Sequence, residues 1–313
     1  MSPTAVRVRV PATSANLGPG FDSFGLALGW YDEVTAEVAS DGVTVEVDGE
    51  AAAAVPRDAS HLVVASMLAA FRRWAAEPPG LRVRCHNSIP HGRGLGSSAA
   101  AIVAGVVAAR ALLGEDGVDE VDVLALAAEL EGHPDNVAAA LHGGFTLAWE
   151  AESGARCVRL APHPAVLPVV CVPDWPMSTE AARGLLPPTV PHADAVFNSA
   201  RSGLLVAALT ERPELLLEAT RERLHQRYRA AAMPPAAELL AELRTHAIPA
   251  VLSGAGPTVM ALCDARRHDS GRVAEVAEGA RRDCGDAAGR WRVESPPVDL
   301  EGARVQWLAR SAE

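Results

Sequence analysis

The chain has 313 residues, a formal net charge of −11, 49% hydrophobic and 21% charged residues. This length is sufficient for two ordinary domains, each with its own core. The acidic balance argues against a nucleic-acid partner, which favours a basic surface. No apolar run reaches the ~20 residues that a membrane span needs, and Met1–Thr4 lacks the charged and apolar regions of a secretory signal. We therefore expect a cytoplasmic protein with neither a nucleic-acid nor a membrane partner.

All 28 basic residues are Arg, because the chain contains no Lys. A Walker A loop requires Lys, so the P-loop NTPases are excluded. Enzymes that form Schiff bases or bind pyridoxal phosphate through Lys are excluded for the same reason. The cysteines form no Cys-x-x-Cys pair, and we expect reduced thiols rather than a disulfide framework or a zinc site. They are Cys85, Cys157, Cys171, Cys263 and Cys284.

In the first half of the chain, alternating apolar and polar residues predict strands, which indicate an antiparallel sheet. These strands cover residues 7–10, 30–39, 43–47 and 81–86, with a turn at Asp41-Gly42. An Ala- and Val-rich helix, apolar on nearly all sides and therefore buried, is expected at Ser97–Leu113. Two helices and a strand follow, at residues 121–131, 134–141 and 145–149.

Beyond about residue 160 the predicted strands and helices interleave, which indicates a compact α+β sandwich. The strands are expected at residues 166–172, 250–252, 258–263 and 291–294. The helices are expected at residues 179–186, 193–209, 239–246 and 272–282. We place the domain boundary near the Pro162-His163-Pro164 segment, which gives domains at 1–161 and 162–313.

The segment Pro90–Ala100 has three glycines at alternate positions, followed by two serines and the start of the apolar helix. Glycine lets the backbone turn tightly and approach a ligand without a Cβ. A helix N-terminus offers unpaired N–H groups and a positive dipole, which favour phosphate. The alternative is a glycine turn with a Ser cap. We expect phosphate groups to bind at Pro90, His91, Gly92, Arg93, Gly94, Leu95, Gly96, Ser97, Ser98, Ala99 and Ala100.

This loop resembles the central motif of the GHMP kinases, a family that includes galactokinases, homoserine kinases, mevalonate kinases and phosphomevalonate kinases. Val10–Asp22 resembles the N-terminal motif of the family, and Leu252–Thr258 resembles its C-terminal glycine motif. The strings P-A-T-S-A-N-L-G-P-G-F-D, E-G-H-P-D-N and S-G-A-G-P-T are most similar to the homoserine kinase group. Two residues depart from the common pattern: His91 stands where Leu is frequent, and Ala139 where Pro is frequent.

The resemblance implies a two-domain α+β fold. Its N-terminal, ATP-binding domain is similar to domain 2 of ribosomal protein S5, and its C-terminal domain is a ferredoxin-like α/β sandwich. It also implies ATP-dependent phosphorylation of the L-homoserine hydroxyl to O-phospho-L-homoserine in threonine biosynthesis, with Mg²⁺, and is compatible with a homodimer. Two alternatives stay open: another GHMP kinase of the mevalonate type, and a non-catalytic nucleotide-binding protein on the same fold.

The resemblance also implies roles for polar residues around the loop. Mg²⁺ prefers hard oxygen ligands, and Ser98 and Glu131 match the hydroxyl and carboxylate of the family. Glu129 is the competing carboxylate, interpreted as an exposed helix charge. We expect His133 and Asn136 to orient the hydroxyl as catalytic residues together with Ser98 and Glu131. Whether the Asp135 carboxylate faces the hydroxyl, as a general base must, is left open.

The expected substrate is a zwitterion, so its carboxylate calls for Arg and its amino group for an acidic acceptor. Arg183 and Arg229 match the substrate arginines of the family, with Arg227 as the main competitor of Arg229. Asp22 is the expected acceptor. The complete expected substrate-binding set is Asn16, Asp22, His133, Asn136, Thr179, Arg183, Arg229 and Gly256. The alternative to substrate binding at this segment is a structural role, in which Ser178 or Thr179 is a helix N-cap.

Overall fold

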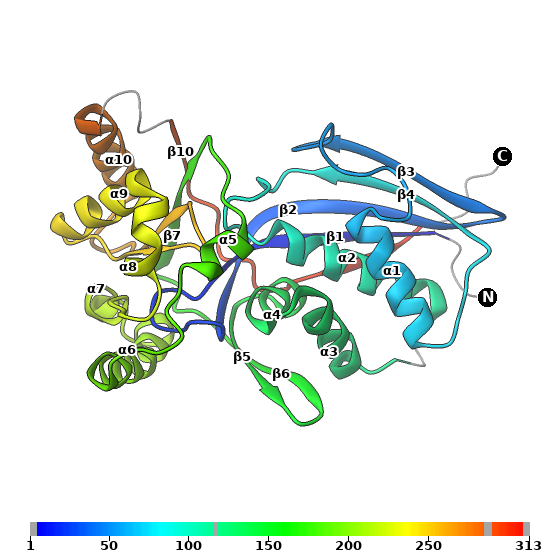
Figure 1. Ribbon diagram of the computed structural model, residues 1–313, viewed down its shortest axis with the longest axis horizontal. Helices are drawn as coiled ribbons and strands as arrows, with labels where there is room; N and C mark the ends of the chain where they lie inside the picture. Colours follow the sequence, from blue (N-terminus) through cyan, green and yellow to red (C-terminus); the bar gives the residue numbers. More distant parts are fainter. Residues whose placement is uncertain (1–4, 115–117, 285–289, 309–313) are drawn as a thin grey trace.

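The computed structural model describes residues 5–114, 118–284 and 290–308. Two β-sheets with their helices lie next to one another along the long axis of the molecule (Figure 1). Both halves of the chain mix helices and strands, as the sequence predicts.

Within the described residues the first sheet has seven strands in the order β11-β1-β2-β4-β3, with β5 paired to β2 and β6 to β5. The strands are β1 (Ala5–Ala15), β2 (Phe24–Ala39), β3 (Gly42–Gly49), β4 (Gly80–Asn87), β5 (Phe145–Ala151), β6 (Gly154–Leu160) and β11 (Arg304–Trp307). The long strand β2 joins the two parts of the sheet, because its first residues pair with β5 and its later residues with β4.

The expectation of an antiparallel sheet is wrong at one position, because β3 runs parallel to β4. Strands β2 and β3 therefore form no hairpin across the Asp41-Gly42 turn, and β4 lies between them. Charge favours this order. Arg82 of β4 bonds to Glu37 of β2 at 3.3 Å, and Arg84 of β4 bonds to Glu46 of β3 at 3.0 Å. Direct pairing of β2 with β3 would place like charges beside each other, which destabilises a sheet.

Four helices cover one face of the first sheet (Figure 1). They are α1 (Leu62–Arg73), α2 (Ser97–Leu113), α3 (Glu120–Glu131) and α4 (Pro134–His142). The buried helix α2 has the bounds that the sequence predicts, and α1 crosses it closely at Gly105. A Cβ on Gly105 would lie 2.4 Å from the carbonyl oxygen of Val63, so only glycine allows this approach. The small residues of α2 thus fix the helix layer that holds its N-terminus in place.

The second sheet has the order β10-β7-β9-β8 among the described residues. Its strands are β7 (Val166–Pro173), β8 (Ala250–Leu252), β9 (Val259–Asp264) and β10 (Trp291–Glu294). Helices α9 (Pro234–Thr245) and α10 (Ser270–Cys284) pack together beside this sheet. The remaining helices are α5 (Thr179–Gly184), α6 (His192–Thr210), α7 (Leu216–Ala219) and α8 (Gln226–Arg229). Two short 3₁₀ turns cover Pro213–Leu215 and Ala230–Ala232.

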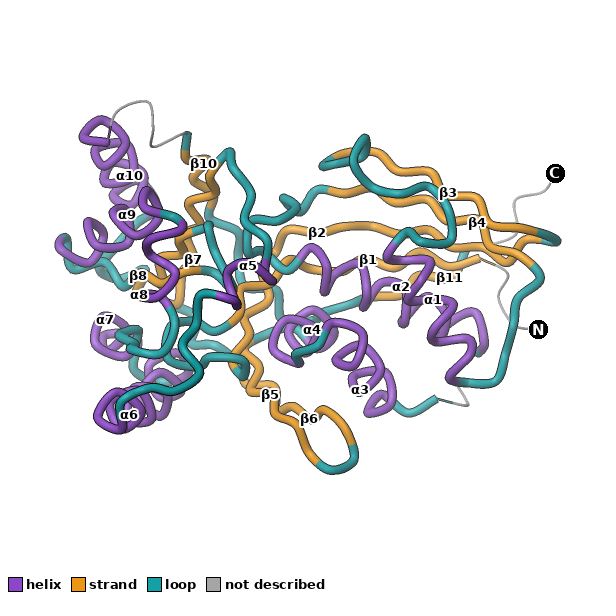
Figure 2. The backbone as a smooth tube through the Cα atoms, in the orientation of Figure 1, coloured by secondary structure: helices purple, strands orange, loops and turns teal. Residues whose placement is uncertain are grey.

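The last strand returns to the first sheet, where β11 pairs antiparallel with β1 (Figure 2). The backbone N–H of Gly29 donates to the Pro297 carbonyl at 2.7 Å, so the segment before β11 is also attached to β2. The predicted boundary at 161/162 falls between β6 and β7 and stays a prediction. The first sheet is completed by residues from the far end of the chain.

Four of the five cysteines have described side chains, and all four are free thiols: Cys85, Cys157, Cys171 and Cys263. The side chain of Cys284 lies outside the described residues. Burial raises the pKa of Cys85 and of Cys171 to about 12, so both stay protonated at neutral pH. Among the helices in the described part of the chain, none has the length and apolar character needed to cross a membrane.

Candidate active site

A cavity of about 180 Å³ lies where residues of all three sequence motifs meet. Its walls come from both halves of the chain. The first half contributes the loop after β1 and the ends of α2, α3 and α4, and the second half contributes α5 and α8. The lining residues are Asn16, Asp22, Gly92, Gly94, Gly96, Ser97, Ser98, Glu131, His133, Asp135, Asn136, Met177, Ser178, Thr179, Arg183, Arg229, Gly254 and Ala255. Gly256, predicted for this site, is absent from the lining, and its neighbours Gly254 and Ala255 take that place.

The glycine loop, residues 90–100, packs between the N-terminal motif at residues 10–22 and the C-terminal motif at residues 252–258. Gly94 has φ +72°, and a Cβ there would lie 2.2 Å from the carbonyl oxygen of Ser253. Gly96 has φ +70°, and a Cβ there would lie 1.9 Å from Oγ1 of Thr13. Gly94 and Ser253 are also joined by a hydrogen bond, because the Ser253 hydroxyl donates to the Gly94 carbonyl at 2.6 Å. Glycine is therefore required at both positions by backbone conformation and by space.

Helix α2 begins directly at the end of this loop. Gly96, which precedes its first residue, has no side chain with which to cap the first N–H groups. The first N–H groups of any helix lack intrahelical acceptors, and here the Gly96 position provides no side-chain acceptor for them. Ser97 and Ser98 of this first turn line the cavity. This arrangement of free amides and a positive helix dipole can bind an anionic phosphate group.

The other predicted loop residues face elsewhere. The Arg93 guanidinium donates to the carbonyls of Pro173 and Asp174 at 3.0 and 2.9 Å, so it ties the loop to the end of β7. Leu95 and Ala99 belong to the core, while His91 and Ala100 line a neighbouring cavity. Pro90 lies with Arg93 beside a third, surface cavity. Five residues of the predicted loop thus line the main cavity: Gly92, Gly94, Gly96, Ser97 and Ser98.

Ser98 and Glu131 form a direct pair, with the hydroxyl donating to Oε1 at 2.7 Å. Burial raises the pKa of Glu131, against the opposing effects of the Ser98 hydrogen bond and of nearby His133. Glu129, the competing carboxylate, is exposed and does not line the cavity. The described residues contain no group of three or more His, Cys, Asp or Glu side chains arranged to hold a metal ion. One carboxylate and one hydroxyl suit Mg²⁺, which retains waters and binds substrate phosphates.

His133, Asp135 and Asn136 form a hydrogen-bonded group at the start of α4. Asp135 Oδ1 lies 2.7 Å from Nδ1 of His133 and accepts the backbone N–H of Asn136 at 2.8 Å. Burial acts to lower the pKa of His133, but the hydrogen bond and charge of Asp135 outweigh it, and the pKa is raised. The Thr13 hydroxyl donates to Oδ1 of Asn136 at 2.8 Å. These contacts fix the orientation of the His133 ring and the Asn136 amide.

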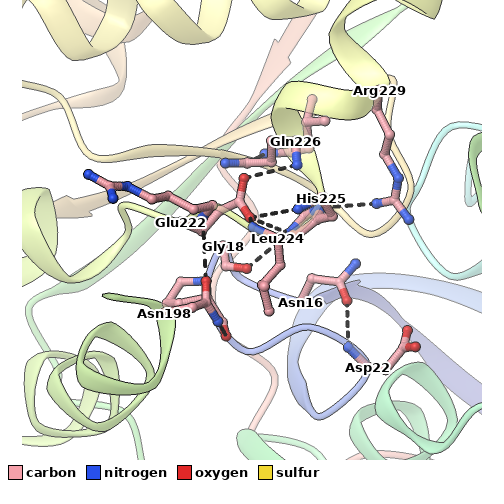
Figure 3. A network of polar contacts seen from close by, with 12 residues as sticks. Asn16, Gly18, Asp22, Asn198, Glu222, Leu224, His225, Gln226 and Arg229 are labelled. Atoms are coloured by element: carbon pink, nitrogen blue, oxygen red, sulfur yellow. Dashed lines mark hydrogen bonds and ion pairs between the residues drawn. The ribbon is translucent and has the colours of Figure 1, made fainter. Parts of the chain in front are cut away.

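The loop after β1 is held in an unusual backbone conformation. Asn16, Leu17 and Asp22 have φ of +66°, +49° and +54°, a left-handed region that costs side-chain-bearing residues roughly 1–2 kcal/mol each. Contacts with the rest of the site maintain it. The Asn16 amide donates to the Gly254 carbonyl at 2.9 Å. The Asp22 N–H donates to Oδ1 of Asn16, also at 2.9 Å (Figure 3). This loop directs the Asp22 carboxylate to the cavity.

Asp22 and Arg183, predicted for opposite ends of the substrate, bind each other. The two guanidinium–carboxylate hydrogen bonds measure 2.8 and 2.9 Å. The hydrogen bond to Asp22 raises the pKa of Arg183. Arg183 lies on α5, whose N-cap is Ser178, because its hydroxyl accepts the Ala181 N–H at 3.0 Å. Thr179 follows the cap and lines the cavity.

Arg229 is 2% exposed, although its guanidinium borders the cavity. It donates to the carbonyls of Ala182 and Gly254, each at 3.3 Å, and its Nη1 lies 3.0 Å from Nδ1 of His225. Arg227, the competing residue, instead donates to Asp194 at 2.6 Å and lies outside the cavity lining. The structure therefore brings Arg229, and not Arg227, to the site.

Sequence reasoning missed three residues that shape the site. Thr13 orients Asn136, His225 contacts Arg229, and Met177 lines the cavity wall. Thr13 lies within the N-terminal motif, so the motif itself contained a signal for it. His225 and Met177 precede short helices and follow no periodic pattern, and only the packed structure shows where they lie.

A second cavity, of about 260 Å³, adjoins the first and shares Gly92, Ser97 and Ser98 with it. Its other walls are mostly apolar and come from β2, α1 and α2. They are Asp32, Val34, Val55, Pro56, Ser60, His61, Leu62, Val63, Asn87, His91, Ala100, Ala101 and Ala104. Nδ1 of His61 is buried without a hydrogen-bond partner, which marks an unsatisfied polar group in this wall.

The chain is similar to known proteins over nearly its whole length. The GHMP kinases N terminal domain model matches residues 61–144, and the GHMP kinases C terminal model matches residues 204–286. A homoserine kinase of Streptomyces coelicolor is 53% identical over 311 residues, covering 99% of this chain and 97% of the relative. A homoserine kinase of Streptomyces avermitilis is 56% identical over 308 residues, covering 97% of each chain. The crystal structure of homoserine kinase from Cytophaga hutchinsonii superposes with a TM-score of 0.83 at 28% identity, covering 97% and 98% of the two chains.

The chain belongs to the GHMP kinase family, whose fold it has, and is an ATP-dependent small-molecule kinase. Within that family it groups with the homoserine kinases, which it matches over nearly its whole length.

Proposed function

We propose that the protein is a homoserine kinase, which transfers the γ-phosphoryl group of ATP to the hydroxyl of L-homoserine. The observation that carries this proposal is the composition of the main cavity. The same cavity contains a helix N-terminus suited to phosphate and the side chains of Asp22, Arg183 and Arg229. An acidic acceptor beside two guanidinium groups is complementary to an α-amino acid. Mevalonate has a carboxylate but no amino group, and would leave Asp22 without a ligand partner.

In this proposal the residues act chiefly by positioning the two reactants. Asp22 binds the amino group, Arg183 and Arg229 bind the carboxylate, and Asn16 and Thr179 complete the acceptor site. His133 and Asn136 orient the hydroxyl toward the glycine loop. The new bond joins the hydroxyl oxygen to the γ-phosphorus, the bond to the β,γ-bridging oxygen breaks, ADP leaves, and the hydroxyl proton is released. Positioning and charge stabilisation are the main contributions to such transfers.

We propose Ser98 and Glu131 as the residues that hold Mg²⁺ together with the ATP phosphates. Bound there, the ion would offset the negative charge of the phosphoryl group. The Ser98–Glu131 hydrogen bond, between two residues that line the cavity next to the glycine loop, supports this assignment. Asp135 is proposed to orient His133 through its Oδ1, which is already bonded to that ring.

We propose the second cavity as the place of the adenine base. It adjoins the loop through Ser97 and Ser98, so phosphates on the loop and a base in this cavity fit one nucleotide. Apolar walls suit the faces of the base, while His61 and Asn87 offer polar groups to its edge. With this assignment the acceptor and the nucleoside occupy separate cavities that meet at the glycine loop.

The test is a coupled ADP-release assay with purified protein, ATP, Mg²⁺ and a panel of alcohols, with the product identified by ³¹P NMR and mass spectrometry. We expect turnover with L-homoserine and formation of O-phospho-L-homoserine. Transfer to mevalonate but not to homoserine would refute the proposal. Tight ATP binding with no turnover on any alcohol would instead favour a non-catalytic nucleotide-binding protein.

The proposed product is the precursor that the sequence resemblance implies for threonine biosynthesis, and we assign the protein to that pathway in the cytoplasm. A strain that lacks its own homoserine kinase and requires threonine provides the cellular test. Expression of this chain should restore growth without threonine, whereas a Glu131→Gln variant should not.

A further inference from the structure

His225 lies immediately behind the main cavity, between the loop after β1 and Arg229 (Figure 3). Its side chain is completely buried and does not itself line the cavity. Nε2 lies 2.9 Å from the carbonyl oxygen of Gly18, and Nδ1 lies 3.0 Å from Nη1 of Arg229. The ring thus connects the loop that carries Asn16 and Asp22 with the arginine at the opposite wall.

The two partners of His225 determine where its proton resides. A carbonyl oxygen only accepts hydrogen bonds, and a guanidinium only donates them. Nε2 must therefore carry the proton that Gly18 accepts, and Nδ1 must present a lone pair to Arg229. A doubly protonated ring would set an N–H of His225 against an N–H of Arg229. Burial lowers the pKa of His225, the nearby Glu222 carboxylate raises it and Arg229 lowers it, so that on balance the ring stays neutral.

The ring is held rigidly in this orientation. The Glu222 carboxylate is buried and accepts the backbone N–H groups of residues 224, 225 and 226 at 2.6, 2.9 and 2.9 Å. Phe21 packs against the other side of the imidazole, with ring centroids 5.2 Å apart. Figure 3 shows the hydrogen bonds of Glu222 in the tight turn that precedes α8. The Nδ1 lone pair therefore has a fixed direction.

This fixed acceptor matters because Arg229 has an unfavourable neighbour. Burial lowers the pKa of Arg229, and the charge of Arg183 at the same cavity lowers it further. The bonds of Arg229 to carbonyl oxygens are both long, at 3.3 Å, so His225 is its shortest recorded contact. These bonds use Nε and Nη1 of Arg229, and the residue lines the cavity.

A neutral acceptor orients Arg229 without neutralising it. A carboxylate in the place of His225 would hold the guanidinium equally well, but it would pair with the charge and weaken the attraction for an anionic ligand. The neutral imidazole of His225 orients the guanidinium and leaves its positive charge unpaired. Arg183, by contrast, is already paired with Asp22. Arg229 is consequently the guanidinium whose full charge remains available to a substrate carboxylate.

We propose that His225 is a positioning residue that gives the site its preference for an acceptor with a carboxylate. In its neutral form, protonated on Nε2, it aims Arg229 into the cavity and couples that arginine to the loop of Asn16 and Asp22. This inference rests on the proposed function, because the ligand of Arg229 is taken to be the carboxylate of the amino-acid acceptor.

The two amide substitutions of His225 separate its two hydrogen bonds. In His225→Gln the amide reaches the place of Nε2 and keeps a donor for Gly18, but Arg229 loses its acceptor. In His225→Asn the amide oxygen lies near the place of Nδ1 and keeps the acceptor, but Gly18 loses its donor. Loss of a charged hydrogen bond predicts that Gln raises KM for L-homoserine by roughly 10- to 100-fold with little change in kcat. Asn should recover most of that loss.

A second substrate tests the connection with the carboxylate. 3-Aminopropan-1-ol has the hydroxyl and amino group of homoserine but lacks its carboxylate. We expect His225→Gln to leave kcat/KM for this amino alcohol near the wild-type value while lowering it for homoserine. In an Arg229→Gln background, adding His225→Gln should have little further effect, because the two residues act as one unit. His246→Gln, at an exposed histidine remote from the cavity, is the matched control.

The outcomes distinguish the inference from the proposed function. Equal losses for Gln and Asn, or equal losses for the two substrates, would mean that His225 only supports the fold, and would overturn the inference. Additive effects of His225→Gln and Arg229→Gln would also overturn it. A wild-type protein that does not phosphorylate homoserine at all would refute the proposed function instead. Thermal unfolding of each variant establishes that the rates refer to folded protein.

Discussion

Asp22 and Arg183 form a two-point ion pair at the main cavity, with hydrogen bonds of 2.8 and 2.9 Å between the carboxylate and the guanidinium. The two side chains are 34% and 42% exposed, so the pair is accessible to solvent. Such a pair contributes little to stability, about 0–1 kcal/mol. A zwitterionic ligand offers each partner an opposite charge, and it can replace one ion pair with two. The pair is therefore suited to open for an amino acid at low cost.

Asp22→Asn is expected to raise KM for L-homoserine by roughly 10- to 100-fold, because the amide removes the charge that pairs with the amino group. The KM for ATP should stay close to the wild-type value. Initial rates with each substrate varied in turn provide the measurement. Glu180→Gln, which removes an exposed carboxylate from the neighbouring helix α5, is the control and should change neither value. An unaltered KM for homoserine in Asp22→Asn would exclude Asp22 as the amino-group partner.

Glu131→Gln is expected to lower kcat by about 100-fold or more even at saturating Mg²⁺, because the neutral amide is a poor ligand for a hard cation. The substitution is nearly isosteric, so the fold should tolerate it. Glu129→Gln, at an exposed position two residues earlier on the same helix, is the matched control and should retain wild-type kcat. Full kcat in Glu131→Gln would show that another residue holds the ion.

Gly96→Ala is expected to abolish phosphate binding at the loop, since the new Cβ would lie 1.9 Å from Thr13 Oγ1 and 3.2 Å from Asn136 Oδ1. Thr13 would have to move, and its hydrogen bond to Asn136 would break. Gly42→Ala is the control, because Gly42 has a similar φ of +67° but nothing within 4 Å of the added Cβ. Gly42→Ala should cost roughly 1 kcal/mol of stability through backbone strain alone, and leave activity intact. Calorimetric titration with an ATP analogue measures binding to both variants.

The stability of the protein should depend on the titration of His225. Its pKa in the folded protein is lowered below the ordinary value of 6.5, so the unfolded chain binds a proton there at a higher pH than the folded one. The stability that follows from the neutral ring is fully present above pH 6.5 and is lost as pH falls toward the lowered pKa. Urea unfolding of wild type and His225→Gln between pH 5 and 8 measures this effect. The difference in unfolding free energy between the two proteins should become less favourable to wild type below pH 6.5, and a constant difference would contradict the assignment.

Periodicity was sufficient for helices α2 and α4 and for the existence of most strands of the two sheets. The bounds of α2 follow from its continuous apolar run between the loop serines and Gly114, and the structure has the same bounds. Helix α4 begins at the predicted residue because Pro134 suits a first turn. The three motifs meet in space as their resemblance to one family implies. Ten of the predicted polar residues line the main cavity: Asn16, Asp22, Ser97, Ser98, Glu131, His133, Asn136, Thr179, Arg183 and Arg229.

Other features depend on pairings between distant residues, which a local pattern does not contain. The place of β4 between β2 and β3 reflects charge pairing across strands. Helix α1 was missed because His61 is a poor N-cap and no acidic residue stands in the first turn. The choice of Arg229 over Arg227 depends on which side of α8 faces the cavity, and a four-residue helix has too little sequence to indicate it.

The return of β11 to β1 has a consequence for the order in which the protein is made. Strand β1 leaves the ribosome about 290 residues before its partner β11. Until residues 304–307 emerge, one edge of β1 has no partner strand, and an unpaired edge can associate with other chains. Domains generally form from the N-terminus as they are synthesised. Here the first sheet can be completed only after the strands of the second sheet have been synthesised, so nascent chains that stall before residue 304 would expose an edge that the folded protein conceals.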